Sequence, residues 1–375
     1  MSVVREVPVV LRHRPTNPPG SGGAGPDQGR QGGRWRRWRR LLIGLLVTVL
    51  LLGVGALGAG LALQSRLDQQ LSRVDGVFAG LENRPQKPTT GTAAKAVNIL
   101  LMGTDLRSDD PSTGTAAEVE PWVPGAQRTD TIMILHVDGD RQGASLISIP
   151  RDAWVSVPGH GRQKINAAFS LAGPDLAVHT VEQLTGVRID HLAVVDWMGF
   201  QALIDTVGGI RVDVAETVED PLRDVLWVEG RQTLDGPLAL LYVRQRYGLP
   251  GGDLDRVRRQ QAVMRALADE SVSVLRSLNP KGIYDLLDTL TRHVTVDSGW
   301  SIEEMRDLLV DLRSLRVSSI DFFTAPVAGF GTERGQSVVR LDGAGNAALW
   351  ESVRDDRVAE WLKSSRADTL TGPVR

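Results

Sequence analysis

The sequence predicts a mixed α/β domain, a central β-sheet flanked by helices, preceded by one transmembrane helix. Two observations lead to this prediction. From Ala96 onward, short runs rich in β-branched and aliphatic residues alternate with longer runs of helical periodicity, which is typical of a sheet covered by helices. Nearer the start, residues 41–63 (LLIGLLVTVLLLGVGALGAGLAL) form a run of 23 residues without a charge.

This uncharged run is long enough to span a membrane. At about 1.5 Å per residue it covers a hydrocarbon core of about 30 Å with some tilt, whereas a buried core helix of this length would show a polar stripe. Trp35 and Trp38 stand among five arginines just before it, as expected of an interfacial anchor with its positive end in the cytoplasm. A cleaved signal peptide is the alternative, but its apolar region is typically about 7 to 15 residues. We therefore expect an uncleaved anchor in the cell membrane, with the N-terminus in the cytoplasm and the folded domain outside the cell.

The chain divides into four predicted parts. Residues 1–40 are rich in Arg, Pro and Gly and should form a disordered cytoplasmic tail. Residues 41–63 are the transmembrane helix. Residues 64–95 are expected to be a stalk, because Leu67, Leu71 and Val74 recur at helical spacing, followed by the linker RPQKPTTGTAAK. The folded domain is predicted to cover residues 96–375, including a C-terminal strand and helix.

The elements of the folded domain follow from periodicity and capping. Strands are predicted at residues 97–102, 131–137, 144–149, 191–195, 210–214, 294–296, 318–323 and 337–341. Helices are predicted at residues 167–171, 176–184, 198–207, 237–242, 254–275, 280–292, 301–312 and 344–354. Asn279 before Pro280 is typical of an N-cap, and Ser301 with Glu304 forms a capping-box pattern.

Composition excludes several function classes. The first 40 residues carry a net charge of +7, so the formal total of -2 leaves -9 on the rest of the chain. An acidic domain lacks the electrostatic footprint of a nucleic-acid binder. Cysteine is absent, which excludes disulfides, a thiol nucleophile and a cysteine metal site. The six histidines are scattered, with no HExxH, and no GxSxG motif occurs, so histidine-based catalysis is not expected.

Arginine and aspartate recur together at three strand ends. Asp105 and Arg107 follow the first predicted strand, and Asp109 and Asp110 lie on the same loop. Arg128 and Asp130 precede the second strand, and Arg151 and Asp152 follow the third after Pro150. A single surface ion pair contributes only about 0–1 kcal/mol and is common. Three such pairs in equivalent positions indicate one shared site, since ligands of α/β sheets bind beyond the strand ends.

The densest cluster of charge is YVRQRYGLPGGDLDRVRRQQ, residues 242–261. Arg244 and Arg246 would face one side of an extended segment, and Arg256 and Arg259 share a helix face by their i, i+3 spacing. Like charges this close require anions. Neighbouring carboxylates would supply them in a structural salt-bridge network, and phosphate groups would supply them in a binding site. We favour phosphate, because the first turn of the following helix also offers free N–H groups.

In order and spacing, these motifs resemble those of the LytR-CpsA-Psr (LCP) family of cell-envelope enzymes. They are NILLMGTDLR, QRTDTIMILHV, ISIPRDAWVSVPGHGRQKINAAF, DTVGGIRVDV and YVRQRYGLPGGDLDRVRRQQ. The resemblance implies a sheet between helices that encloses an apolar tunnel for a polyprenyl chain, which periodicity alone does not locate. It also implies a Mg²⁺-dependent transfer of a phosphate-linked glycopolymer from a polyprenyl-diphosphate carrier to a peptidoglycan hydroxyl.

The resemblance also assigns residues to roles. Asp105 and Asp130 match the positions that would hold Mg²⁺. The positions that would surround the diphosphate are Arg107, Arg128, Arg151, Arg244, Arg246, Arg256 and Arg259. The implied catalytic residues are Arg107, Arg128, Arg151 and Asp253, with Asp253 or a neighbouring Asp as the base, whereas Asp255 falls where the family varies. Two alternatives remain open, a polyprenyl-diphosphate hydrolase and a non-catalytic module that binds envelope polymers. The polymer itself could be arabinogalactan, teichoic acid or capsule.

Overall fold

A computed structural model describes most of the chain beyond residue 68. The described residues are 69–106, 112–113, 122, 125, 127–245, 247–277, 279–312, 319–365, 367–370 and 372–374. The expected cytoplasmic tail (residues 1–40) and transmembrane segment (residues 41–63) lie outside them. Within the described ranges, no helix combines the length and the apolar character needed to cross a membrane.

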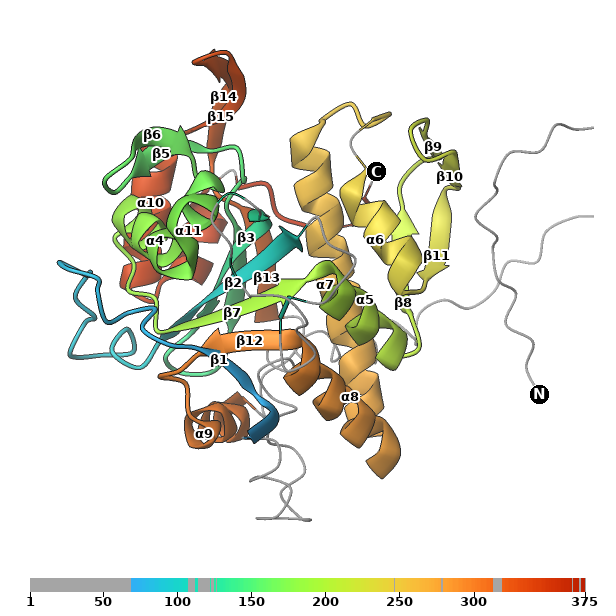
Figure 1. The fold of residues 1–375 in the computed structure, drawn as a ribbon, viewed down its shortest axis with the longest axis horizontal. Coiled ribbons are helices and arrows are strands. Elements are labelled where there is room, and N and C mark those ends of the chain that lie inside the picture. Colours follow the sequence, from blue (N-terminus) through green and yellow to red (C-terminus); the bar gives the residue numbers. More distant parts are fainter. Residues whose placement is uncertain are drawn as a thin grey trace, which may run out of the picture.

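A seven-stranded mixed sheet forms the centre of the domain (Figure 1). Its strands, in spatial order, are β1 (Ser72–Val74), β12 (Val294–Asp297), β7 (His191–Asp196), β2 (Val97–Leu106), β3 (Gln127–Val137), β4 (Ala144–Ser148) and β13 (Ile320–Thr324). The pairs β1–β12, β2–β7 and β4–β13 are parallel, and β7–β12, β2–β3 and β3–β4 are antiparallel. The predicted mixed sheet is confirmed.

Helices cover both faces of this sheet (Figure 1). One group is α4 (Ala167–Thr185), α10 (Gly343–Arg354) and α11 (Val358–Ser364), and the other is α5 (Trp197–Thr206), α6 (Gly236–Arg244), α7 (Asp253–Arg276) and α8 (Pro280–His293), while α9 (Ile302–Leu312) follows β12. Successive side chains of a strand point to opposite faces. On β3, Met133 and Leu135 therefore enter one hydrophobic cluster, and Ile132 and Ile134 enter the other. The sheet is buried on both sides, which explains its nearly continuous apolar strands.

Among the described residues, four two-stranded antiparallel sheets lie outside the central sheet. They pair β5 (Trp154–Val157) with β6 (Gly161–Lys164), β8 (Ile210–Val214) with β11 (Gly230–Leu234), β9 (Val218–Asp220) with β10 (Val225–Trp227), and β14 (Val327–Glu333) with β15 (Gln336–Leu341). The β14–β15 hairpin projects from the body of the domain (Figure 1). Only β8 and β15 were predicted; β5, β6, β9 and β10 are at most four residues long.

The predicted caps are present, the predicted break inside α4 is present, and α11 was not predicted. Asn279 accepts a hydrogen bond from the Lys281 backbone N–H at 3.1 Å. Ser301 and Glu304 bond each other's backbone N–H groups at 3.1 and 3.0 Å, the reciprocal capping box. The two short helices predicted at 167–171 and 176–184 are confirmed as the two halves of α4, which are separated by non-helical backbone at Ala172 and Gly173, whose φ is 83°, next to Pro174. Proline removes a helical N–H and displaces the preceding turn, which accounts for the kink.

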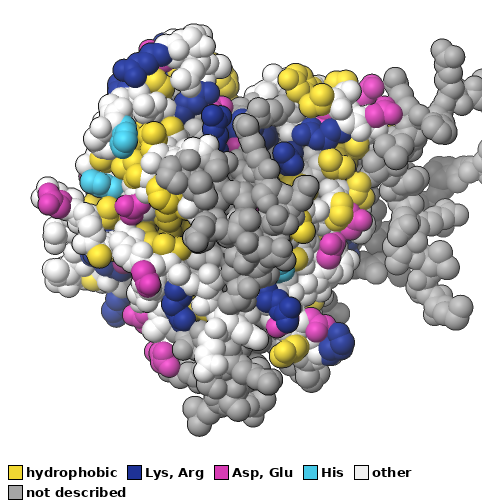
Figure 2. Space-filling view, in the orientation of Figure 1, with side chains coloured by type: hydrophobic (Ala, Val, Ile, Leu, Met, Phe, Trp, Pro, Cys, Tyr) yellow, Lys and Arg dark blue, Asp and Glu magenta, His cyan; other side chains and the backbone are white. Residues whose placement is uncertain are grey.

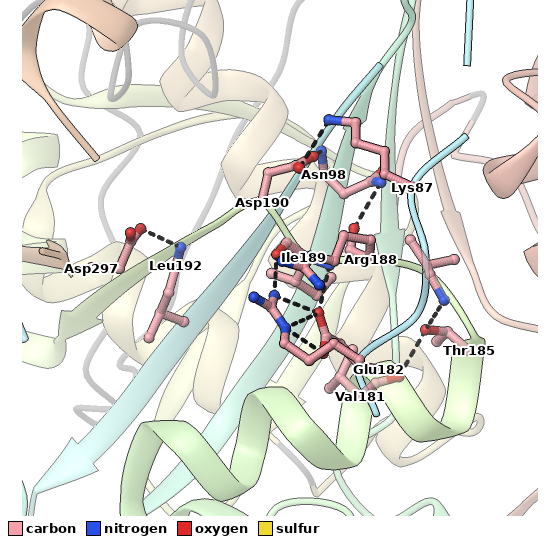
Figure 3. Close-up of polar contacts among 12 residues, drawn as sticks. Lys87, Asn98, Val181, Glu182, Thr185, Arg188, Ile189, Asp190, Leu192 and Asp297 are labelled. Carbon is pink, nitrogen blue, oxygen red and sulfur yellow. Dashed lines mark hydrogen bonds and ion pairs between the residues drawn. The ribbon is translucent and has the colours of Figure 1, made fainter. Parts of the chain in front are cut away.

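Residues 69–95 differ from the predicted stalk and linker. Residues 72–74 form β1, which pairs in parallel with β12 at the edge of the central sheet. Val77 is buried in the core, and Arg84 forms an ion pair with Glu182 of α4, whose surroundings are shown in Figure 3. The helical spacing of Leu71 and Val74 was misleading because an edge strand of three residues is too short to establish a period of two. The folded domain therefore begins before the predicted boundary at residue 96.

A buried carboxyl on α7 makes the stability of the fold depend on pH. Burial raises the pKa of Asp269 to about 7, while nearby Arg265 opposes the shift. In the unfolded chain the same group titrates near its ordinary value of 3.8. Between these values the folded state retains a proton that the unfolded state releases, so this contribution to stability is present below about pH 4 and is lost as the pH rises through 7.

We expect Asp269→Asn to be more stable than the wild type at pH 8 by on the order of 1–2 kcal/mol, a value discounted because the carboxyl retains partial exposure. At pH 4 the two should be equal, since Asn resembles the protonated acid. Urea unfolding at both pH values measures the difference. Asp285→Asn is the control, because Asp285 is a partly exposed carboxylate paired with Lys281. A stability gain that does not change with pH would contradict the assignment.

Candidate active site

The three strand ends that carry Arg and Asp meet at one edge of the sheet. Asp105 of β2 is in register with Arg128 of β3, and Ser148 at the end of β4 is opposite Met133 of β3. Because β3 is antiparallel to both neighbours, its start lies beside their ends. Arg151, three residues beyond Ser148, is thereby brought next to Asp130. The sheet topology thus brings together Arg and Asp residues that lie in separate motifs of the sequence.

A polar cavity of about 890 Å³ opens at this edge. Its walls come from β3, the β4–β5 connection, hairpin β5–β6, α4, α5, the β9–β10 turn, the α6–α7 region and hairpin β14–β15. Four of the predicted diphosphate-binding arginines line it, Arg128, Arg151, Arg244 and Arg256, together with Asp130 of the predicted metal pair. Figure 2 shows Lys and Arg side chains gathered in the upper half of one face, below the β14–β15 hairpin and towards α6. On a domain of net negative charge, this concentration of cations indicates an anionic ligand.

Arg151 is held between carboxylates at the centre of the cavity wall. Its Nη1 forms an ion pair with Asp130 Oδ1, and its Nε lies 3.8 Å from Asp152 Oδ2. Asp152 in turn pairs with Lys164 of β6 at 2.9 Å. The side chains of Arg151 and Asp130 are only 11% and 13% exposed. This chain of alternating charges fixes the guanidinium before any ligand arrives, which reduces the entropy lost on binding.

The connection between α6 and α7 supplies two further arginines to the cavity. The guanidinium carbon of Arg244, at the end of α6, lies 5.3 Å from the centre of the Trp197 ring. Arg256, in the first turns of α7, is only 3% exposed yet lines the cavity. Between them Gly248 has a φ of 80°, and a side chain there would collide with the Glu219 carbonyl. The loop glycine is therefore required by its conformation.

Asp255 and Gln245 shape this loop from within. Asp255 Oδ2 accepts a hydrogen bond from the Gly251 N–H at 2.7 Å and is almost fully buried. The Gln245 amide donates to the carbonyls of Glu219 and Tyr247 at 3.1 and 2.8 Å. Both residues thus order the chain between Arg244 and Arg256.

Arg259 lies elsewhere than expected. It is fully buried and is absent from the lining of the polar cavity. Its Nη1 donates to Gln245 Oε1 at 2.6 Å, and its guanidinium lies 4.1 Å from the centre of the Tyr242 ring. Burial lowers the pKa of Arg259 and raises that of Tyr242 to about 12, so the phenol stays neutral. Arg259 supports the loop that carries the cavity residues. Its i, i+3 spacing from Arg256 predicted that both would face the same ligand, but Arg256 lines the cavity and Arg259 meets the Tyr242 ring and Gln245.

Four predicted site residues fall outside what the structure describes. Arg107 and Arg246 lie outside the described residues altogether. Asp105 is in β2 and Asp253 begins α7, but their side chains are not described. The metal-binding role of Asp105 and the roles of the other three therefore stay predictions.

The cavity also contains charged residues that sequence reasoning missed. Arg223 lines it from the β9–β10 turn and pairs with buried Asp220 at 2.9 Å. Lys164 lines it from β6. Arg223 stands alone in DPLRD, a turn sequence with no motif around it. Lys164 could have been found, because a hairpin after Arg151 would return residues 161–164 to the same edge.

An apolar cavity of about 100 Å³ adjoins the polar one. It lies between strands β2, β3 and β7 and helices α5 to α7, with lining residues that include Leu101, Met133, Ala193, Phe200 and Met264. Three residues line both cavities, Trp197, Val243 and Gln260. The two spaces are therefore neighbours, and together they match a ligand with a charged head and an apolar tail. Much of this wall comes from LAVVDWMGFQALIDTVGGI, which in sequence is indistinguishable from ordinary core.

Comparison with known proteins agrees with this geometry. The model of the LytR_cpsA_psr family matches residues 70–355. The chain belongs to this family. The match begins at residue 70, close to the observed start of β1 and not at the predicted boundary.

Curated relatives and solved structures of LytR-CpsA-Psr proteins resemble the chain over most of its folded part. The cell wall biosynthesis protein LcpA of Corynebacterium glutamicum is 34% identical over 307 residues, 72% of this chain and 59% of that protein. A polyisoprenyl-teichoic acid–peptidoglycan teichoic acid transferase, TagU of Oceanobacillus iheyensis, is 33% identical over 227 residues, 59% of this chain and 64% of that protein. The crystal structure of B. subtilis TagV, 25% identical, superposes with a TM-score of 0.56 over 70% of this chain and 97% of that one. The chain thus spans about three fifths of the length of the two curated relatives.

Proposed function

We propose that this protein transfers a phosphate-linked glycopolymer from a polyprenyl-diphosphate carrier to a hydroxyl group of peptidoglycan, releasing polyprenyl phosphate. The observation that carries the proposal is the contact between an arginine-lined cavity and an apolar one through Trp197, Val243 and Gln260. A diphosphate joined to a polyprenyl chain has this same division into an anionic head and an apolar tail. The names of the family relatives LcpA and TagU support the cell-wall context.

The arginines would act by positioning and by neutralising charge. In phosphoryl transfer the developing charge is spread over the phosphoryl oxygens, so prearranged cationic donors contribute more than covalent assistance does. Arg128, Arg151, Arg244 and Arg256 line the cavity where the diphosphate would lie. In the proposed step the acceptor hydroxyl oxygen bonds to the sugar-linked phosphorus, and the bond from that phosphorus to polyprenyl phosphate breaks. Asp253 or a neighbouring aspartate would take the hydroxyl proton.

The residues at the sheet edge are suited to a hard cation. Mg²⁺ prefers oxygen ligands and is commonly held by one or two carboxylates together with substrate phosphates. Asp130 lines the cavity, and Asp105 is on the neighbouring strand, in register with Arg128. These two aspartates would hold Mg²⁺, which would supply further neutralisation of the diphosphate. Asp130 already pairs with Arg151, so the cation and the arginine would share one carboxylate.

Residues 41–63 would anchor the protein in the cell membrane with its N-terminus in the cytoplasm and the catalytic domain outside. This placement is supported by the length of the segment and by its lack of charged residues. A membrane anchor would also keep the domain close to a carrier whose tail lies in the bilayer.

Mass spectrometry distinguishes the transferase from its alternatives. The full chain in detergent is incubated with a defined polyprenyl-diphosphate sugar, Mg²⁺ and peptidoglycan fragments. A transferase yields a product in which the sugar phosphate is joined to peptidoglycan and not to water. A hydrolase yields free sugar phosphate, and a binding module retains the intact donor. Either of the last two results would contradict the proposal.

Filling the apolar cavity should weaken use of the lipid donor. Ala193, on β7, lines this space, and leucine there adds three carbon atoms. If the larger side chain displaces about two CH₂ groups of the tail, at about 0.8 kcal/mol each, KM for the polyprenyl donor should rise roughly tenfold. Ala347→Leu, at an exposed position on α10, is the matched control and should leave KM unchanged. An equal KM in both variants, with unchanged thermal midpoints, would place the tail elsewhere.

A further inference from the structure

Three metal-ligating side chains meet at the opposite end of β3 from the active-site cavity. His136 Nε2 lies 3.2 Å from Asp356 Oδ1 and 3.7 Å from Asp138 Oδ1. One ligand atom from each of the three residues lies within 4.8 Å of the other two. We call these residues the His136 cluster. Six strand residues separate His136 from Asp130, a distance of roughly 20 Å at about 3.3 Å per residue, so the cluster is not part of the arginine-lined cavity.

Hydrogen bonds outside the cluster determine which imidazole nitrogen carries the proton. The Asn98 Nδ2 donates to the Arg188 carbonyl at 3.0 Å, a contact visible in Figure 3. That bond fixes the amide, so the atom 2.8 Å from His136 Nδ1 is the Asn98 oxygen, which can only accept. Nδ1 therefore carries a hydrogen. In the neutral imidazole, Nε2 then presents its lone pair to the two carboxylates.

With Nε2 unprotonated, the cluster gathers three electron-pair donors in one buried place. His136 is fully buried, and the Asp356 side chain is 3% exposed. Among the described residues, no Lys or Arg pairs with either carboxylate. Arg141, on the loop after β3, directs Nη1 to the Lys95 and Asp138 carbonyls. Converging buried acceptors of this kind are costly unless a proton on Nε2 or a metal cation joins them.

We propose that His136, Asp138 and Asp356 bind one Zn²⁺ ion. A tetrahedral zinc with nitrogen and oxygen ligands at about 2.0–2.2 Å places neighbouring ligand atoms about 3.3–3.5 Å apart. The observed separations of 3.2 and 3.7 Å bracket that spacing. A mixed imidazole and carboxylate set suits zinc better than Mg²⁺, which prefers oxygen alone. The Asn98 contact to Nδ1 orients the ring as the outer partner of a metal-bound histidine usually does.

The surrounding backbone leaves room for the carboxylates and a path to solvent. A side chain at Gly143 would collide with the Asp138 carboxylate. The Gly139 N–H donates to both oxygens of Asp356 at 3.1 Å, which orients that carboxylate towards His136. A cavity of about 530 Å³ lined in part by Gly139 and Asp140 opens next to the cluster, and the Asp138 side chain is 25% exposed. The ion would join the end of β3 to the turn between α10 and α11.

The test measures zinc bound to the full-length protein in detergent. Protein stripped with a chelator is dialysed against ZnSO₄, and zinc per chain is determined by elemental mass spectrometry, with Co²⁺ absorption as a report on tetrahedral geometry. We expect one ion per chain in the wild type. Asp138→Asn, isosteric and partly exposed, should lower the affinity at least tenfold. Asp140→Asn is the matched control, because Asp140 lies on the same loop and bonds only the neighbouring Gln142.

Two further variants separate this site from the proposed active site. His136→Gln should abolish the Co²⁺ spectrum, and Asp130→Asn should leave zinc stoichiometry unchanged while impairing transfer. Equal zinc binding by Asp138→Asn and Asp140→Asn would overturn the proposal. So would a wild-type protein that retains no zinc and whose His136 shows hydrogens on both ring nitrogens by ¹⁵N NMR, since a proton would then occupy the place assigned to the metal.

Discussion

Replacing Arg151 by alanine is expected to lower kcat/KM for polymer transfer by about 100- to 1000-fold, the loss typical of removing one prearranged donor to a transition-state anion. Arg151 is 11% exposed, lines the polar cavity and is held by Asp130 and Asp152. Its removal takes away a fixed cation and leaves the Asp130 carboxylate facing the diphosphate, so repulsion adds to the lost attraction. The measurement is transfer from a polyprenyl-diphosphate donor at saturating Mg²⁺.

Two companion variants separate charge from geometry at this position. Arg151→Lys keeps the charge but loses the planar pair of donors, so it should recover only part of the activity. Arg162→Ala removes an exposed arginine of β6 whose Nη2 donates to the Trp154 carbonyl, and it should leave transfer unchanged. A loss of less than tenfold in Arg151→Ala, with an unaltered thermal midpoint, would show that Arg151 does not contact the reacting phosphates.

The sequence predicted the central elements well because their physical signals are local. The buried strands β2, β3 and β4 are apolar runs bounded by turn residues, and α8 and α9 begin at recognisable caps. Several of the elements missed are short. In β1, β9 and β10, three residues each, the pairing partner and not the local pattern determines the structure, and that partner lies far away in the chain.

The motifs of the site could be predicted from the sequence, but the spatial arrangement of their side chains could not. Strand ends with Arg and Asp were visible in sequence, yet only the antiparallel order of β2, β3 and β4 brings Asp130 to Arg151. Arg256 and Arg259 show the limit of helical periodicity. Both are buried on α7, but Arg256 faces the cavity whereas Arg259 meets Tyr242 and Gln245. Helical periodicity shows which residues share a face, but tertiary structure determines what packs against that face.

Replacing Arg84 by alanine is expected to destabilise the folded domain by about 3–5 kcal/mol, because it leaves a buried carboxylate without its partner. Arg84 Nη2 contacts Glu182 Oε1 at 2.6 Å and the Ile189 carbonyl at 2.7 Å, and Nε contacts Glu182 Oε2 at 2.9 Å. The Glu182 side chain is fully buried. Its other hydrogen-bond partner is the Ile189 N–H at 2.9 Å, part of the network in Figure 3. Urea unfolding of the wild type and variant gives the loss.

A double variant tests whether the loss of stability in Arg84→Ala comes from the unpaired charge or from the lost contact area. If the uncompensated carboxylate is responsible, adding Glu182→Leu to Arg84→Ala should restore much of the stability, since a well-packed apolar pair can replace a buried ion pair. Lys281→Ala removes one partner of an exposed i, i+4 pair with Asp285 and should cost at most about 0.5 kcal/mol. If Arg84→Ala also costs less than about 1 kcal/mol, residues 69–95 are docked by the apolar contacts of Val77 and Phe78 and not by the ion pair. Recovery in the double variant would instead show that the loss in Arg84→Ala comes from the unpaired Glu182 carboxylate, and that an apolar pair can hold the segment preceding β2 against α4.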